Sequence, residues 1–81
     1  MKFVFVIWED AFSADFWMPK SGAEDLSPLM NKSVGFVVKD NENFLSIAQT
    51  YNDSDHINNL LVLPKRSIYS IQEQELSWKS R

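Results

Sequence analysis

Apolar residues gather in short runs separated by polar clusters along this chain, a pattern typical of β-strands joined by turns. The clearest case is the segment 34–51, VGFVVKDNENFLSIAQTY, in which two apolar runs flank the polar cluster 40–43. β-Branched and aromatic residues dominate both runs, as a pleated and half-buried surface favours. The segment therefore predicts a β-hairpin around which the other, shorter runs pack.

Three further apolar runs predict strands at 3–8, 60–63 and 68–71. The first run is apolar without interruption, which predicts a strand buried on both faces. Pro64 ends the fourth predicted strand, and a single 3₁₀-like turn at 65–67 precedes the fifth. One face chosen from each strand gives a predicted core of Phe3, Phe5, Ile7, Val34, Phe36, Val38, Leu45, Ile47, Leu61, Leu63, Ile68 and Ile71.

The segment 9–32, between the first strand and the hairpin, is the least regular part of the chain. Apolar residues before Pro19 predict a short helical turn from Ser13, and 23–31 predicts a second short helix. We expect a partly structured insertion, of the kind that often carries function on a small β scaffold.

The order of elements predicts one mainly β domain over 1–81, with five strands and a short helical insertion between strands 1 and 2. It resembles an SH3-like or Sm-like small barrel, because the step at 63–68 is similar to the proline-containing turn before the last strand of SH3 domains. The aromatic positions that SH3 domains use for proline-rich ligands have no counterpart here, so the resemblance implies architecture alone. The polar tail at 73–81 is expected to fray or to dock through Trp78.

Composition adds expectations about assembly and partners. The chain has 81 residues, no cysteine and eleven aromatic residues, so it lacks disulfides and carries more aromatic area than a small core needs. A homo-oligomer would bury that excess area. Eleven acidic residues against eight basic ones argue against double-stranded nucleic acid as a partner. The apolar run at the N-terminus is too short to span a membrane and lacks a signal-cleavage site, so we expect a cytoplasmic protein.

No residue pattern predicts catalysis or a cofactor. The only histidine, His56, lies near Asp53 and Asp55, but the spacing fits no metal-ligand pattern and favours a solvated turn. The adjacent pair Glu9 and Asp10 would point to opposite faces of a strand, which does not suit paired carboxylate catalysis. The serines lack a nucleophile motif, and two glycines do not make a phosphate-binding loop. We expect a protein that is not an enzyme.

Aromatic and basic side chains are the one combination that predicts a ligand class. Stacking on a base and pairing with a phosphate together suit a small nucleotide. The candidate ligand-binding residues are Trp8, Trp17, Tyr51, Lys65 and Arg66. The alternative is that these aromatic residues belong to the core or to an interface.

Four segments together resemble a group of short, mostly uncharacterised phage and prophage proteins. The segments are 8–10 (WED), 34–38 (VGFVV), 47–51 (IAQTY) and 63–65 (LPK). The resemblance implies a phage accessory protein, one role of which is to sequester a signalling nucleotide of host defence inside a small oligomer. The competing hypothesis is a protein-interaction module that inhibits a host protein through the acidic segment 9–25, with Phe12, Phe16 and Met18 as contact residues.

Overall fold

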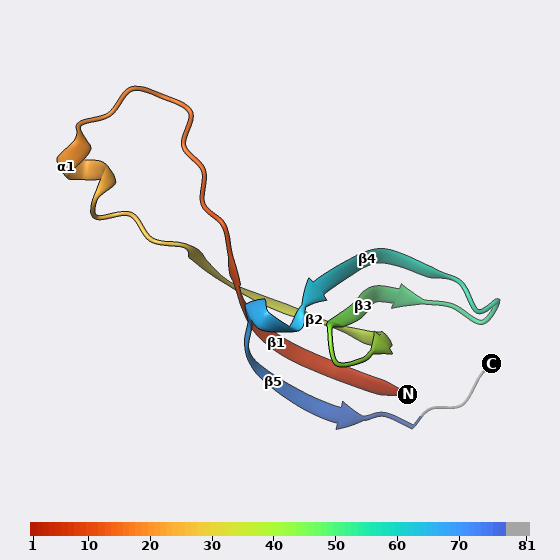
Figure 1. Cartoon of the computed structure of the whole chain (residues 1–81). Helices are drawn as coiled ribbons and strands as arrows, with labels where there is room; N and C mark the ends of the chain where they lie inside the picture. The colour runs from red at the N-terminus through yellow and green to blue at the C-terminus, as the bar shows by residue number, and fades with distance from the viewer. Residues whose placement is uncertain (78–81) are drawn as a thin grey trace.

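The computed structural model describes residues 1–77 and contains one antiparallel sheet of five strands in the order β4-β3-β2-β1-β5 (Figure 1). The strands are β1 (Lys2–Asp10), β2 (Leu29–Asp40), β3 (Phe44–Tyr51), β4 (Ile57–Pro64) and β5 (Ile68–Glu75). A short helix, α1 (Lys20–Ala23), lies between β1 and β2, and a 3₁₀ turn, η1 (Lys65–Ser67), joins β4 to β5. The mainly β fold predicted from the apolar runs is confirmed.

The predicted hairpin and the 3₁₀ turn are confirmed, and contacts within the loops explain both. The side-chain oxygen Oδ1 of Asn41 accepts hydrogen bonds from the backbone N–H groups of Asn43 and Phe44, at 2.8 and 2.9 Å, and so closes the β2–β3 turn. The N–H of Lys65 donates to the carbonyl of Asn43 at 2.8 Å. Lys65 Nζ also lies 2.6 Å from Asp40 Oδ1. The turn and η1 therefore hold each other in place.

The strands are longer than the apolar runs that predict them. β4 begins at Ile57, and β5 continues through the polar residues 72–75, because backbone pairing with β1 does not require apolar side chains at this edge. The structure therefore assigns the first three residues of the expected polar tail, 73–75, to a strand. Trp78 lies outside the described residues.

The sheet is strongly curved but it is not closed into a barrel. Irregularities in the ladders between Val37 and Lys39 and between Ile7 and Trp8 bend the strands, as β-bulges do. The outermost strands, β4 and β5, are not paired with each other over residues 1–77.

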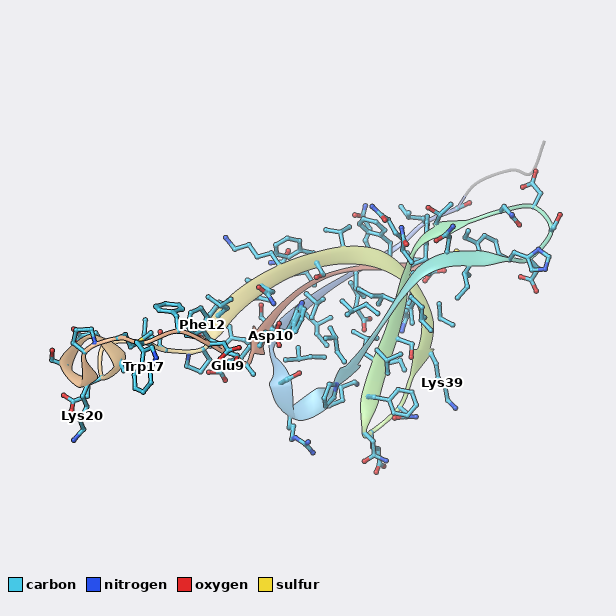
Figure 2. The ribbon with its side chains drawn as sticks, turned by 90° about the horizontal axis from the view of Figure 1, so that it is seen from above. Glu9, Asp10, Phe12, Trp17, Lys20 and Lys39 are labelled. Carbon is cyan, nitrogen blue, oxygen red and sulfur yellow. The ribbon has the colours of Figure 1, made fainter. Side chains whose placement is uncertain are left out.

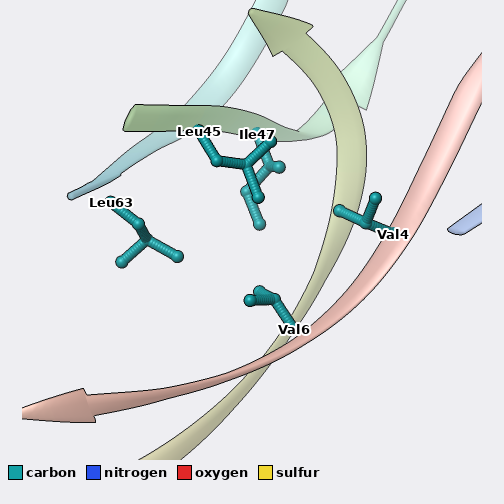
Figure 3. Packing of buried hydrophobic residues seen from close by; sticks show 5 residues of the cluster. All are labelled: Val4, Val6, Leu45, Ile47 and Leu63. Carbon is teal, nitrogen blue, oxygen red and sulfur yellow. The ribbon is translucent and has the colours of Figure 1, made fainter. Parts of the chain in front are cut away.

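The hydrophobic core lies inside the curve of the sheet. Its buried members converge from three strands (Figure 3) and are Val4, Val6, Leu45, Ile47 and Leu63. The residues that pack around them are partly buried: Trp8, Val37, Leu61, Ile68 and Ile71. The core residues predicted from β3, β4 and β5 all belong to this cluster or pack against it.

The predicted faces of β1 and β2 are wrong, because these strands place the other set of side chains inside. Phe3, Phe36, Ala48 and Leu60 are paired in one row across four strands, on the face opposite to the core cluster. We call this side the outer face. On it, Phe3, Phe5, Ile7 and Phe36 are only partly buried, and Val34 is about half exposed. Val38, which was also predicted in the core, lies at the irregularity in β2 and is 47% exposed.

The two helices predicted within the insertion are wrong. Residues 13–19 have no helix, and 29–31 belong to β2 rather than to a helix. The helix that does form, α1, comprises four residues that begin directly after Pro19, whose carbonyl accepts hydrogen bonds from the N–H groups of Gly22 and Ala23. Pairing between Asp10 and Leu29 extends the strands into the segment where periodicity predicted helix.

Candidate functional site

The loop between β1 and β2 extends away from the sheet and exposes large apolar side chains. We call residues 11–28 the arm. Figure 2 shows Phe12, Trp17 and Lys20 along the arm, with Glu9 and Asp10 where it leaves the sheet. The molecule accordingly measures 57 × 22 × 18 Å. None of the residues 11–28 is buried, so the arm contributes nothing to the core.

The side chains of the arm are apolar and acidic. Trp17 is fully exposed, at 102% of its reference area, and Phe16 is 70% exposed. Phe12 and Leu26 are exposed by about half, whereas Met18 is partly buried. The arm has three acidic residues and one lysine. The only ion pair within it, among the described residues, joins Lys20 and Glu24 at 3.8 Å in an exposed position.

Side-chain hydrogen bonds hold β1 and β2 together at the end of the sheet from which the arm extends. The indole Nε1 of Trp8 donates to the hydroxyl oxygen of Ser33 at 3.0 Å. Farther out, Asn31 Nδ2 donates to Asp10 Oδ2 at 3.3 Å. Trp8 also packs against the core cluster, so it connects the start of the arm to the interior of the sheet.

A cavity of about 520 Å³ lies at the base of the arm. Its lining joins the end of β1, the start of β2, η1 and β5, through Glu9, Met30, Arg66, Ser67, Ile68 and Tyr69. Tyr69 is 77% exposed, and Arg66 forms no ion pair within residues 1–77. The lining of this cavity therefore includes the guanidinium of Arg66, the carboxylate of Glu9 and the exposed ring of Tyr69.

The structure does not gather the five predicted ligand-binding residues into one place within a chain. Trp17 lies on the arm, Arg66 borders the cavity at its base, and Trp8 packs on the core. Lys65 is paired with Asp40. Tyr51 is at the end of β3, next to the β3–β4 loop.

Tyr51 has a specific partner in that loop. Its hydroxyl donates a 2.6 Å hydrogen bond to Asp55 Oδ1. That hydrogen bond and the negative charge of the carboxylate raise the pKa of Tyr51 above its ordinary value of 10.0. Asp55 has a positive φ of 63°, a conformation that aspartate tolerates in turns.

Two classes of site find no support in the described part of the chain. Within residues 1–77 no group of three or more histidine and carboxylate side chains is arranged to hold a metal ion. His56 is exposed, as the predicted solvated turn requires. Within the same residues, no helix is long and apolar enough to cross a membrane.

Sequence reasoning missed residues that the fold brings to the base of the arm. Met30 and Tyr69 are distant in the chain and meet only because β1 pairs with both β2 and β5. The alternation of Ile68, Tyr69 and Ser70 is a signal that Tyr69 faces away from the core. The exposure of Leu26 has no comparable signal in the sequence.

Comparison with known proteins identifies no relative: no protein-family model, curated protein or solved structure matches the chain.

Proposed function

We propose that this protein is a non-enzymatic binding protein that docks its arm on the surface of another protein chain. The observation that carries the proposal is the fully exposed Trp17, which lies beside the exposed Phe16 on a protruding loop. Grouped apolar side chains in contact with water normally mark an interface. Tryptophan is also among the residues that contribute most to binding energy at interfaces.

The charge of the arm supports a particular class of partner surface. Asp15, Glu24 and Asp25 accompany the aromatic side chains, and Lys20 is the only base of the arm. A complementary surface is apolar at its centre and has lysine or arginine at its rim. The biological setting that we propose, from the resemblance to short phage proteins, is the cytoplasm of a host cell.

The architecture that we propose is a small barrel of the SH3-like or Sm-like type that is open between β4 and β5. The strand order and the position of η1 before β5 support this interpretation.

Replacement of Trp17 tests the proposed function. Trp17→Ala should weaken binding of the purified chain to its protein partner by more than about tenfold, because loss of an interface anchor costs about 2 kcal/mol or more. Ile57→Ala is the matched control, because it removes an exposed apolar side chain outside the arm and should leave binding unchanged. The affinity is measured by titration with the purified partner. Equal affinity of the Trp17→Ala variant and the original chain would refute the proposal.

A second candidate function is the capture of a small nucleotide in the cavity at the base of the arm. Arg66 would bind a phosphate, Tyr69 would stack on the base, and Glu9 would accept hydrogen bonds from an amino or ribose hydroxyl group. Native mass spectrometry with cyclic and linear nucleotides tests this function. Bound nucleotide should be released chemically unchanged, and Arg66→Glu should abolish its binding while the fold is retained. Binding that survives Arg66→Glu would exclude this cavity.

A further inference from the structure

The arm cannot be covered by the sheet of its own chain. It extends from the end of the paired strands β1 and β2, away from the other strands (Figures 1 and 2). Phe16 and Trp17 form a shallow surface only with their neighbours in the arm, Ala14 and Asp15. A second protein surface is therefore required to remove these aromatic rings from water.

The outer face of the sheet is a second apolar surface, and residues 1–77 leave part of it exposed. Val34 on β2 and Leu60 and Val62 on β4 are each about half exposed. The strands that carry them are joined through β3, where Ala48 pairs with Leu60 and Ser46 pairs with Val62. Ala48 and Ser46, which lie between them on β3, are buried and add almost no accessible area to the outer face.

Two lysines border this apolar surface. Lys32 pairs with Ile7, and Lys39 pairs with Ser46, so the ladders place both on the outer face, on either side of Val34 along β2. Within residues 1–77 neither lysine forms an ion pair, although Lys39 Nζ lies 5.5 Å from the centre of the Phe44 ring. The outer face thus has an apolar centre with Lys32 and Lys39 at its rim, and Glu9, two residues beyond Ile7, shares this face.

The arm and the outer face have opposite charge and the same apolar character. The arm presents aromatic rings with Asp15 and Asp25, neither of which forms an ion pair within the described residues. Protein interfaces commonly join two surfaces that are apolar at the centre and carry opposite charges at the rim. The opposite charges give such interfaces their specificity.

We infer that the partner of the arm is a second copy of this chain: the arm of each copy docks on the outer face of the other. In this dimer Phe16 and Trp17 cover Val34, Leu60 and Val62. Asp15 and Asp25 face Lys32 and Lys39. The inference rests on the proposed function of the arm and adds the identity of its partner. When each arm docks on the other copy, a single two-fold axis relates the two chains and both arms are covered. The assembly therefore contains two chains and exposes no further docking surface of this kind.

Charge reversal on the two surfaces tests the inference. One variant carries Asp15→Lys and Asp25→Lys on the arm, and a second carries Lys32→Glu and Lys39→Glu on the outer face. Each replaces exposed side chains, so both should fold like the original chain. The original chain should be a dimer by native mass spectrometry and light scattering. Each variant alone should dimerise more weakly by more than about tenfold, because like charges then face each other.

An equimolar mixture of the two variants provides the decisive measurement. In the mixed pair, both interfaces again join opposite charges, so a heterodimer should form with the affinity of the original dimer. Glu42→Lys is the matched control, because it reverses an exposed charge in the β2–β3 turn and should not affect dimerisation.

Three results would overturn the inference: an original chain that is a monomer, a dimer that withstands both charge reversals, or variants that fail to recombine. The proposed function is judged separately. Suppose that one of these three results is found, and that the chain binds a different protein in a way that Trp17→Ala abolishes. The arm would then remain a docking element, but its partner would not be a second copy.

Discussion

At the scale of single residues, Gly35 is the position where the sheet tolerates least change. A β-carbon built there would lie 2.8 Å from the carbonyl oxygen of Ala48 and 3.2 Å from Cβ of Ile47. Both are parts of the neighbouring β3 that cannot swing aside without moving the strand. Gly35→Ala should therefore lower the free energy of unfolding by about 1–3 kcal/mol, as overpacked positions do. Urea-induced unfolding measures the change.

The second glycine is the matched control for this prediction. A β-carbon at Gly22 would meet nothing within 4 Å, and the residue lies in α1, where alanine is the better helix former. Gly22→Ala should leave the unfolding midpoint unchanged, because the arm does not contribute to the core. If the two substitutions changed the free energy of unfolding equally, the close approach of β2 and β3 would not be what restricts residue 35 to glycine.

The hydrogen bond between Tyr51 and Asp55 predicts a titration at high pH. Because the pKa of Tyr51 is raised in the folded chain, the pair stabilises the fold fully below the unfolded pKa, about 10. This contribution is lost as the pH rises through the folded pKa. In a Tyr69→Phe background, where Tyr51 is the only tyrosine left, the ultraviolet absorbance of tyrosinate reports its pKa.

Asp55→Asn in the same background is the comparison. It removes the charge, so the pKa of Tyr51 should fall toward 10. An unchanged titration curve would mean that Asp55 does not interact with the hydroxyl in solution.

At the scale of elements, the two faces of β1 and β2 differ in their contribution to stability. Val6 is fully buried in the core cluster, whereas Val38 is 47% exposed. Val6→Ala should lower the free energy of unfolding by about 2 kcal/mol, and Val38→Ala, the same chemical change, by less than about 1 kcal/mol. Chemical denaturation of both variants measures the difference. A larger effect at Val38 would contradict the assignment of faces.

The sequence of β1 and β2 could not predict these faces, and the reason is physical. An alternating strand reveals its buried side because polar residues mark the other side. The run FVFVIW has no polar residue, so Val4 and Val6 are indistinguishable in pattern from Phe3 and Phe5. The faces of β3 and β4 were predicted correctly at Leu45, Ile47 and Leu63.

At the scale of the whole molecule, local signals predicted the five strands and η1 but not the structure of the insertion, whereas the arrangement of surfaces depended on strand pairing. The turn at 40–43 and the step at Pro64 have characteristic residues, so the hairpin and η1 were predictable. The cavity that Arg66 and Tyr69 share with Met30 was not, because only the pairing of β1 with two neighbours brings these residues together. Trp17 was identified as a candidate from its residue type, but its full exposure follows from the extension of the β1–β2 ribbon.

The place where the arm joins the sheet has a consequence for how such a protein evolves. The last residue of β1, Asp10, is paired with the first residue of β2, Leu29, so the arm enters and leaves the sheet at neighbouring positions. Segments of other length or composition can replace it there without changing the register of any strand. The length and sequence of the arm can therefore change while the pairing of the five strands is kept, as an antibody framework keeps its sheets while its loops diversify.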